Sequence, residues 1–184
     1  MKPVLLASAA FVALTGVASA ETAPADILTT YADIAHAGYE DSLKTAEALQ
    51  AAVENLTANP SEATLLAARA AWVAARIPYQ QTEAFRFGNA IVDEWEGKVN
   101  AWPLDEGLID YVAADYGSES DTNSLYTANV IASPTLMVAG SEVDASTFTP
   151  ELLSETLQEA EGVEANVATG YHAVEFLLWG QDLN

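Results

Sequence analysis

The segment GYHAVE, residues 170–175, holds the clearest combination of metal-binding side chains in this sequence. On a helix, His172 and Glu175 lie three residues apart and point to the same side, so an imidazole nitrogen and a carboxylate oxygen can converge on one cation. A simple surface contact also has this spacing, so the pair alone leaves both interpretations open. The apolar stripe beside the pair favours the metal site, because a partly buried histidine and carboxylate need partners.

A second group of polar side chains occurs in ARIPYQQTEAFRFG, residues 75–88. If this segment stays helical, four side chains share a sector of roughly 80°: Arg76, Tyr79, Glu83 and Arg86. Glu83 can supply a further metal ligand, while Arg76 or Arg86 holds a carboxylate or a bound anion by paired hydrogen bonds. The alternative is a salt bridge between arginine and glutamate that only joins helices.

The third group lies in WPLDEGLIDYV, residues 102–112, which contains three carboxylates: Asp105, Glu106 and Asp110. Such oxygen ligands can complete a shell around iron, manganese, zinc or calcium. Taken individually, each is more typical of a helix cap or a solvated charge. His36 is a weak reserve ligand, more typical of a partly exposed helical residue.

Several catalytic patterns are absent from the sequence. It contains no HExxH helix, no cysteine, no serine in a nucleophile elbow and no glycine-rich phosphate loop. A hydrolase would therefore depend on the metal and an adjacent carboxylate alone.

The elements that position these groups are predicted to be helices. Apolar and small residues recur at helical spacing over residues 26–56, with Gly38 a possible interruption, and over residues 61–87, where Pro78 should bend or break the helix. Residues 88–117 are irregular and predict an ordered loop with short helical turns, which Trp95 and Trp102 pack onto the helices.

The remaining chain predicts shorter elements. We expect a short helix at 125–130, an exposed polar linker at 140–147, and helices at 151–160 and 164–179. No strand-turn-strand series is evident. The sequence thus predicts an all-α fold, an up-and-down four-helix bundle with one long ordered loop between its second and third helices.

The first twenty residues have the layout of a secretory signal peptide: Lys2, an apolar stretch at 4–17 and small residues at 18–20. A membrane anchor is the alternative, but the stretch is shorter than the ~20 residues a spanning helix needs. We therefore predict an exported protein whose residues 21–184 form one domain with no transmembrane segment.

The net charge of the chain argues against some classes of partner. Without Lys2, five basic side chains remain against 27 acidic ones, a net charge of −22. This excess repels phosphate backbones and anionic lipid, which argues against nucleic-acid and membrane-surface functions. It suits a binder of cations, and adaptation to a salty medium explains it equally well.

Three segments together resemble the imelysin family, which includes insulin-cleaving outer-membrane proteins and iron-regulated proteins. They are the GxHxxE pattern at Gly170, His172 and Glu175 with its continuation FLLWGQDLN, the segment WVAARIPYQQTEAFRFG, and the segment WPLDEGLIDYV. The likeness covers about residues 72–184.

The resemblance implies an all-helical fold of four-helix bundles, a periplasmic or outer-membrane location and a role in iron acquisition. It extends to the periplasmic component of Efe-type iron uptake, where the HxxE pair is thought to bind metal. By position, His172 and Glu175 become the leading ligands. Glu83 and Asp110 or Asp105 become their companions, and Arg76, in an RxP element, orients them.

Two features depart from the family pattern. Imelysin-like proteins are usually longer, with a second helical bundle after the motif, so this chain is expected to match their N-terminal half. No cysteine is present for lipid attachment, which favours a periplasmic protein over an anchored one.

Three functions are compatible with the sequence. The first is a periplasmic protein that binds a metal ion, iron or zinc, and acts with other iron-uptake components. The second is a metallopeptidase that uses the same site, and it ranks lower because a ligating glutamate cannot easily serve as the free general base. The third is a metal-free helical interaction module.

Overall fold

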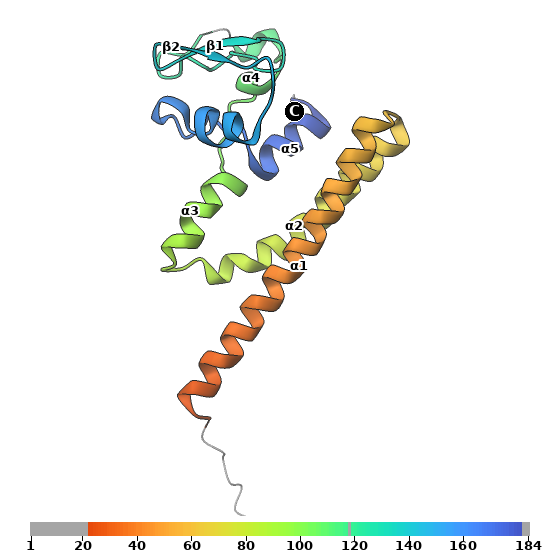
Figure 1. Ribbon diagram of the computed structural model, residues 1–184, viewed down its shortest axis with the longest axis vertical. Coiled ribbons are helices and arrows are strands. Elements are labelled where there is room, and N and C mark those ends of the chain that lie inside the picture. Colours follow the sequence, from red (N-terminus) through yellow and green to blue (C-terminus); the bar gives the residue numbers. More distant parts are fainter. Residues whose placement is uncertain (1–21, 118, 182–184) are drawn as a thin grey trace, which may run out of the picture.

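A long helical hairpin and a compact lobe make up the computed structural model, which describes residues 22–117 and 119–181 (Figure 1). The hairpin consists of α1 (Pro24–Ala58) and α2 (Glu62–Thr82). The predicted signal peptide, residues 1–20, lies outside the described residues. Among the helices that are described, none is both long enough and apolar enough to cross a membrane.

The α1–α2 hairpin confirms the first two predicted helices and the turn between them. A reciprocal capping box starts α2: the Ser61 hydroxyl accepts a hydrogen bond from the Thr64 N–H, and the Thr64 hydroxyl accepts one from the Ser61 N–H, at 3.2 and 3.0 Å. Both helices continue through the interruptions that the sequence predicted, although α2 ends at Thr82 and not at residue 87. α1 continues through Gly38, which faces Thr82 and Phe85 of the partner element, and α2 continues through Pro78.

The lobe is built from short elements. Its helices are α3 (Ala90–Val99), α4 (Glu106–Ile109) and α5 (Gly170–Trp179). A π-helix, η3 (Leu152–Leu157), and three 3₁₀ turns complete the helical part: η1 (Glu83–Phe85), η2 (Ala114–Tyr116) and η4 (Ala160–Gly162). The predicted ordered loop at 88–117 therefore contains α3 and α4.

A β-hairpin corrects the prediction of a polar linker at 140–147. Strand β1 (Thr135–Val138) pairs antiparallel with β2 (Ser141–Asp144). Leu136 and Val138 are buried while their neighbours in β1 are exposed, which is the alternation of a half-buried strand. Ala139 and Gly140 both have positive φ, 49° and 76°, as a two-residue hairpin turn requires.

The prediction of a predominantly helical protein is confirmed, but the up-and-down four-helix bundle is not. Residues 125–130 form turns, the helix expected at 151–160 is reduced to η3, and the last helix begins at Gly170 instead of residue 164. The apolar side chains there gather around the β-hairpin instead of forming helix stripes. This lobe core contains the following residues: Leu108, Leu125, Val130, Leu136, Val138, Ala145, Leu152, Leu157 and Ala160.

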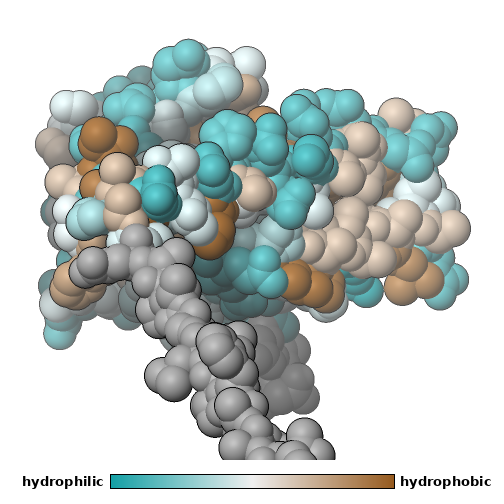
Figure 2. All heavy atoms as spheres, turned by 90° about the horizontal axis from the view of Figure 1, so that it is seen from below, coloured by the Kyte–Doolittle hydropathy of each residue, from teal (hydrophilic) through white to brown (hydrophobic). Residues whose placement is uncertain are grey.

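The helical hairpin is less covered than the lobe. Large apolar side chains with more than half of their surface exposed lie on both helices: Ile27, Leu28, Tyr31, Ile34, Leu43, Leu66, Val73 and Ile77. On the face in Figure 2, hydrophobic patches alternate with hydrophilic side chains. The lobe therefore supplies most of the fully buried core, and α5 joins it to the hairpin.

Candidate metal site

Helix α5 carries the predicted ligands, and a close backbone contact fixes its first residue. Gly170 has φ of +86°, and a Cβ atom at this position would lie 2.5 Å from the carbonyl oxygen of Val99. Only glycine combines this φ with such an approach. The glycine of the GxHxxE pattern therefore sets the distance between α5 and the end of α3.

One side of α5 is buried among aromatic side chains. Tyr171 is 7% exposed, its ring centroid lies 4.9 Å from that of Tyr79, and its carbonyl oxygen accepts a hydrogen bond from the Trp72 indole at 2.9 Å. The Arg76 guanidinium lies 5.1 Å from the Tyr171 ring centroid and donates a hydrogen bond to the Asn100 side chain. Arg76 and Tyr79, predicted to support the ligands, thus hold the opposite side of the helix that carries them.

The other side of α5 presents the histidine and the glutamate. The Nδ1 atom of His172 lies 2.9 Å from Oε2 of Glu175, with 17% and 41% of the two side chains exposed. The Trp102 ring lies over the imidazole, with centroids 4.8 Å apart. Both groups line a cavity of about 390 Å³, together with Glu106 and other residues: Leu104, Phe176, Trp179, Gly180 and Gln181.

The 2.9 Å separation is that of a direct hydrogen bond or ion pair between the two side chains, which matches the contact alternative for this spacing. It is also close to the ~3.0 Å between two adjacent ligand atoms that lie ~2.1 Å from an octahedral cation, whereas a tetrahedral site separates them by ~3.4 Å. An imidazole nitrogen with a carboxylate oxygen suits zinc or iron. Within residues 22–117 and 119–181, however, no group of three or more His, Asp or Glu side chains is placed to hold a metal. Of the predicted ligands, the described residues bring His172 and Glu175 together.

Glu83 belongs to a separate ionic cluster around Arg86. The Arg86 guanidinium lies 3.7 Å from Glu83, 2.7 Å from Asp93 and 3.2 Å from Glu96. The hydrogen bond that Arg86 donates to Asp93, with the charges of Glu96 and Glu83, raises the pKa of Arg86. This arrangement matches the salt-bridge alternative for the second group of polar residues.

Asp105 and Asp110 flank α4 and form local hydrogen bonds. Oδ2 of Asp105 accepts a hydrogen bond from Nδ2 of Asn123 at 2.6 Å, and Oδ1 of Asp110 accepts one from the backbone N–H of Tyr111 at 2.8 Å. Asn123 also donates to the fully buried Asn166 at 2.8 Å. This polar network ties the start of α4 to the lobe.

Glu106 is the carboxylate of this segment that lines the His172 cavity. The family resemblance favoured its neighbours Asp105 and Asp110 as ligands instead. Glu106 is the first residue of α4, whereas Asp105 precedes the helix, so helical geometry sets the direction of the Glu106 side chain alone. A helix of four residues leaves no periodic pattern in the sequence that would distinguish the two carboxylates.

His36, the reserve ligand, forms its own exposed pair with Glu40. Their side-chain atoms are 3.8 Å apart, and the two side chains are 76% and 56% exposed. This pair on α1 has the residue types of the α5 pair without its surrounding cavity. It is therefore a natural control for the α5 site.

Comparison with known proteins agrees with the family resemblance. The sequence model of the imelysin family matches residues 35–184, and the chain belongs to this family. It is similar to "Iron-regulated protein A" of Synechococcus elongatus, with 41% identity over 61 residues. That match covers 33% of this chain and 17% of the relative.

Proposed function

We propose that this chain is an exported imelysin-family protein that binds a metal cation through His172 and Glu175 and takes part in iron acquisition. The observation that carries the proposal is the 2.9 Å pair of imidazole nitrogen and carboxylate oxygen on one wall of a cavity. Family membership and the name of the iron-regulated relative support iron as the metal, with zinc as the second choice. We further propose that the protein lies in the periplasm or at the outer membrane surface and acts there with other proteins of iron uptake.

The chemistry of the chain supports cation binding beyond the two ligands. A net charge of −21 raises the local concentration of cations. Trp102 covers one side of the imidazole and limits its rotation, so less freedom is lost on binding. When bound, the metal would be held by His172 and Glu175, with Glu106 as a further carboxylate of the same cavity. Glu83, Asp105 and Asp110 remain proposed companions of lower rank, because they do not line this cavity.

Equilibrium dialysis of metal-stripped protein against anaerobic Fe²⁺, Zn²⁺ and Ca²⁺ tests the proposal. We expect His172→Ala and Glu175→Gln each to weaken Fe²⁺ or Zn²⁺ binding by at least about ten-fold, since even indirect partners of a metal have effects of this size. His36→Ala and Glu40→Gln are the matched controls and should bind as the parent does. Equal uptake by the parent and His172→Ala would refute the site.

A metallopeptidase remains the second candidate, because the cavity holds Glu106 in addition to the ligating Glu175. A carboxylate that does not bind the metal can activate water, while the cation polarises the peptide carbonyl. Incubation with unfolded casein distinguishes the two functions. Cleavage by the parent that a chelator or Glu106→Gln abolishes would establish the peptidase. Casein that stays intact would favour the metal-binding function.

A metal-free interaction module is the third candidate, and thermal denaturation distinguishes it. A metal that binds only the folded state raises Tm with concentration. We expect Zn²⁺ to raise the Tm of the parent and not that of His172→Ala. An unchanged Tm in the parent would favour the interaction module.

A further inference from the structure

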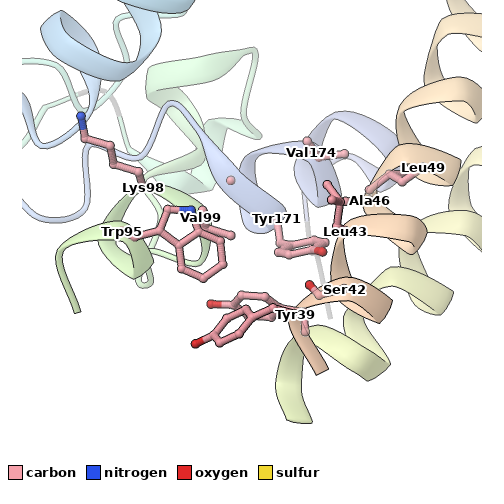
Figure 3. A pocket seen from close by; sticks show the side chains of 12 residues that line it. Tyr39, Ser42, Leu43, Ala46, Leu49, Trp95, Lys98, Val99, Tyr171 and Val174 are labelled. Carbon is pink, nitrogen blue, oxygen red and sulfur yellow. The ribbon is translucent and has the colours of Figure 1, made fainter. Parts of the chain in front are cut away.

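We propose that a second cavity, between α1, α2, α3 and α5, binds an uncharged and mostly apolar small molecule that carries one hydrogen-bond acceptor. Its volume is about 420 Å³, within the range of small-molecule sites. Figure 3 shows Tyr39 and Ser42 of α1, Trp95 of α3 and Tyr171 of α5 around it. It shares no lining residue with the His172 cavity.

The walls of this cavity suit a flat apolar molecule. The Tyr79 ring lies 4.9 Å from the Tyr171 ring and 6.0 Å from the Trp95 ring, so three aromatic side chains border one space. Aliphatic side chains close the rest: Leu43, Ala46, Leu49, Val99 and Val174. Aromatic walls of this kind gain about 0.5–1.5 kcal/mol per ring pair beyond burial of area.

Two hydroxyls in the wall, those of Tyr39 and Tyr79, lack a hydrogen-bond partner within the described part of the chain, and Tyr79 is the more deeply buried residue. Tyr79 is 2% exposed. A buried unpaired hydroxyl is unfavourable, so a ligand that supplies an acceptor regains this free energy. Trp95, which is 41% exposed, is the neighbour of the Tyr79 ring on the α3 side of the cavity.

The charges around Tyr79 favour a neutral ligand over an anion. Burial, followed by the negative charges of Glu96 and Glu83, raises the pKa of the Tyr79 hydroxyl, so it stays an O–H donor at neutral pH. Lys98, the cationic residue of the lining, is paired with Glu155 at 2.7 Å. A carboxylate ligand would therefore meet repulsion that this engaged lysine does little to offset.

The test compares two neutral probes of similar shape, 2-acetylnaphthalene and 2-ethylnaphthalene, by quenching of tryptophan fluorescence and by calorimetry. The acetyl oxygen accepts a hydrogen bond and the ethyl group does not. We expect the parent to bind the acetyl compound about five-fold more tightly, the size of one hydrogen bond. Tyr79→Phe keeps the ring and should reduce this preference, and the double variant Tyr39→Phe, Tyr79→Phe should bind both probes equally.

Ala46→Phe and Ala48→Phe control for the place of binding. Ala46 lines the cavity, whereas Ala48 is exposed two residues further along α1. Ala46→Phe should lose binding of both probes, and Ala48→Phe should keep it. Failure of both probes to bind the parent, or an unchanged preference in Tyr79→Phe, would overturn the proposal. Self-association of the parent that Ala46→Phe abolishes, without probe binding, would assign the cavity to a second polypeptide instead.

Discussion

The two sides of α5 differ in what surrounds them, although they belong to the same ten residues. Tyr171 faces tyrosine, tryptophan and a guanidinium group, and it is almost fully buried. His172, the next residue, borders a cavity with carboxylates and keeps part of its ring exposed. The comparison teaches that the buried aromatic side, which borders the cavity of Figure 3, fixes the position of α5, and that the opposite side holds His172 and Glu175 at a set distance.

Gly170→Ala should break this arrangement with the largest effect. The new methyl group would collide with the backbone at Val99 in a φ region that alanine disfavours, which costs about 3 kcal/mol or more of unfolding free energy. Gly162→Ala is the control, since its φ is +73° but its surroundings are open, and about 1 kcal/mol is expected. Chemical denaturation measures both, and equal losses would contradict the close contact.

Arg76→Met, a change on the buried side of α5, should lower the free energy of unfolding more than His172→Ala does on the opposite side. The variant loses the contacts of the guanidinium with three aromatic rings and its hydrogen bond to Asn100, a loss of about 2 kcal/mol. His172→Ala removes a partly exposed contact and should cost less than about 1 kcal/mol. A larger loss in His172→Ala than in Arg76→Met, by urea denaturation, would reverse the assignment of roles.

The contribution of the buried side of α5 to stability should depend on alkaline pH. Burial raises the pKa of the Tyr171 hydroxyl above 10, so its contribution to stability is complete below pH 10 and is lost as pH rises further. Tyr171→Phe should therefore lose less stability between pH 10 and 11, by up to about 1.4 kcal/mol per pH unit. Tyr111→Phe, at a residue that is 77% exposed, should match the parent.

Glu106→Gln should have the smallest effect of these changes, and it should act on metal binding in the His172 cavity. Removing one charge from the cavity that His172 and Glu175 line should weaken Zn²⁺ binding about three-fold, as equilibrium dialysis measures. Glu94→Gln, an exposed change on α3, is the control. Unaltered Zn²⁺ affinity in Glu106→Gln would show that Glu106 has no part in the site.

The sequence predicted the long elements better than the short ones. The α1–α2 hairpin follows from sustained helical periodicity and from the capping pattern at Ser61. The β-hairpin was missed because its strands are four residues long and its turn begins with Ala139, where asparagine or aspartate is the usual signal. Tertiary packing of Leu136 and Val138 decides that segment.

The candidate site was predictable only where its residues share one helix. The spacing of His172 and Glu175 leads directly to their 2.9 Å contact. Ligands from other segments depend on how the lobe folds, and the sequence contains no distance for them. The sector predicted for Arg76, Tyr79, Glu83 and Arg86 divides into two pairs, Arg76 with Tyr79 and Glu83 with Arg86. The division occurs because η1 ends the α-helical period at Glu83, and Arg86 also pairs with the carboxylates of α3.

Glu161 has a consequence for the behaviour of the lobe in acid. Its carboxylate accepts hydrogen bonds from the Ser124 hydroxyl at 2.7 Å and from the Ala139 N–H in the β-hairpin turn at 2.6 Å. These bonds lower its pKa, so the tether holds above the usual carboxyl pKa of 4.5 and is lost as the pH falls below it. Acidification would therefore release the tip of the β-hairpin, while the hydroxyl-based cap at Ser61, which carries no charge, would keep α1 and α2 joined.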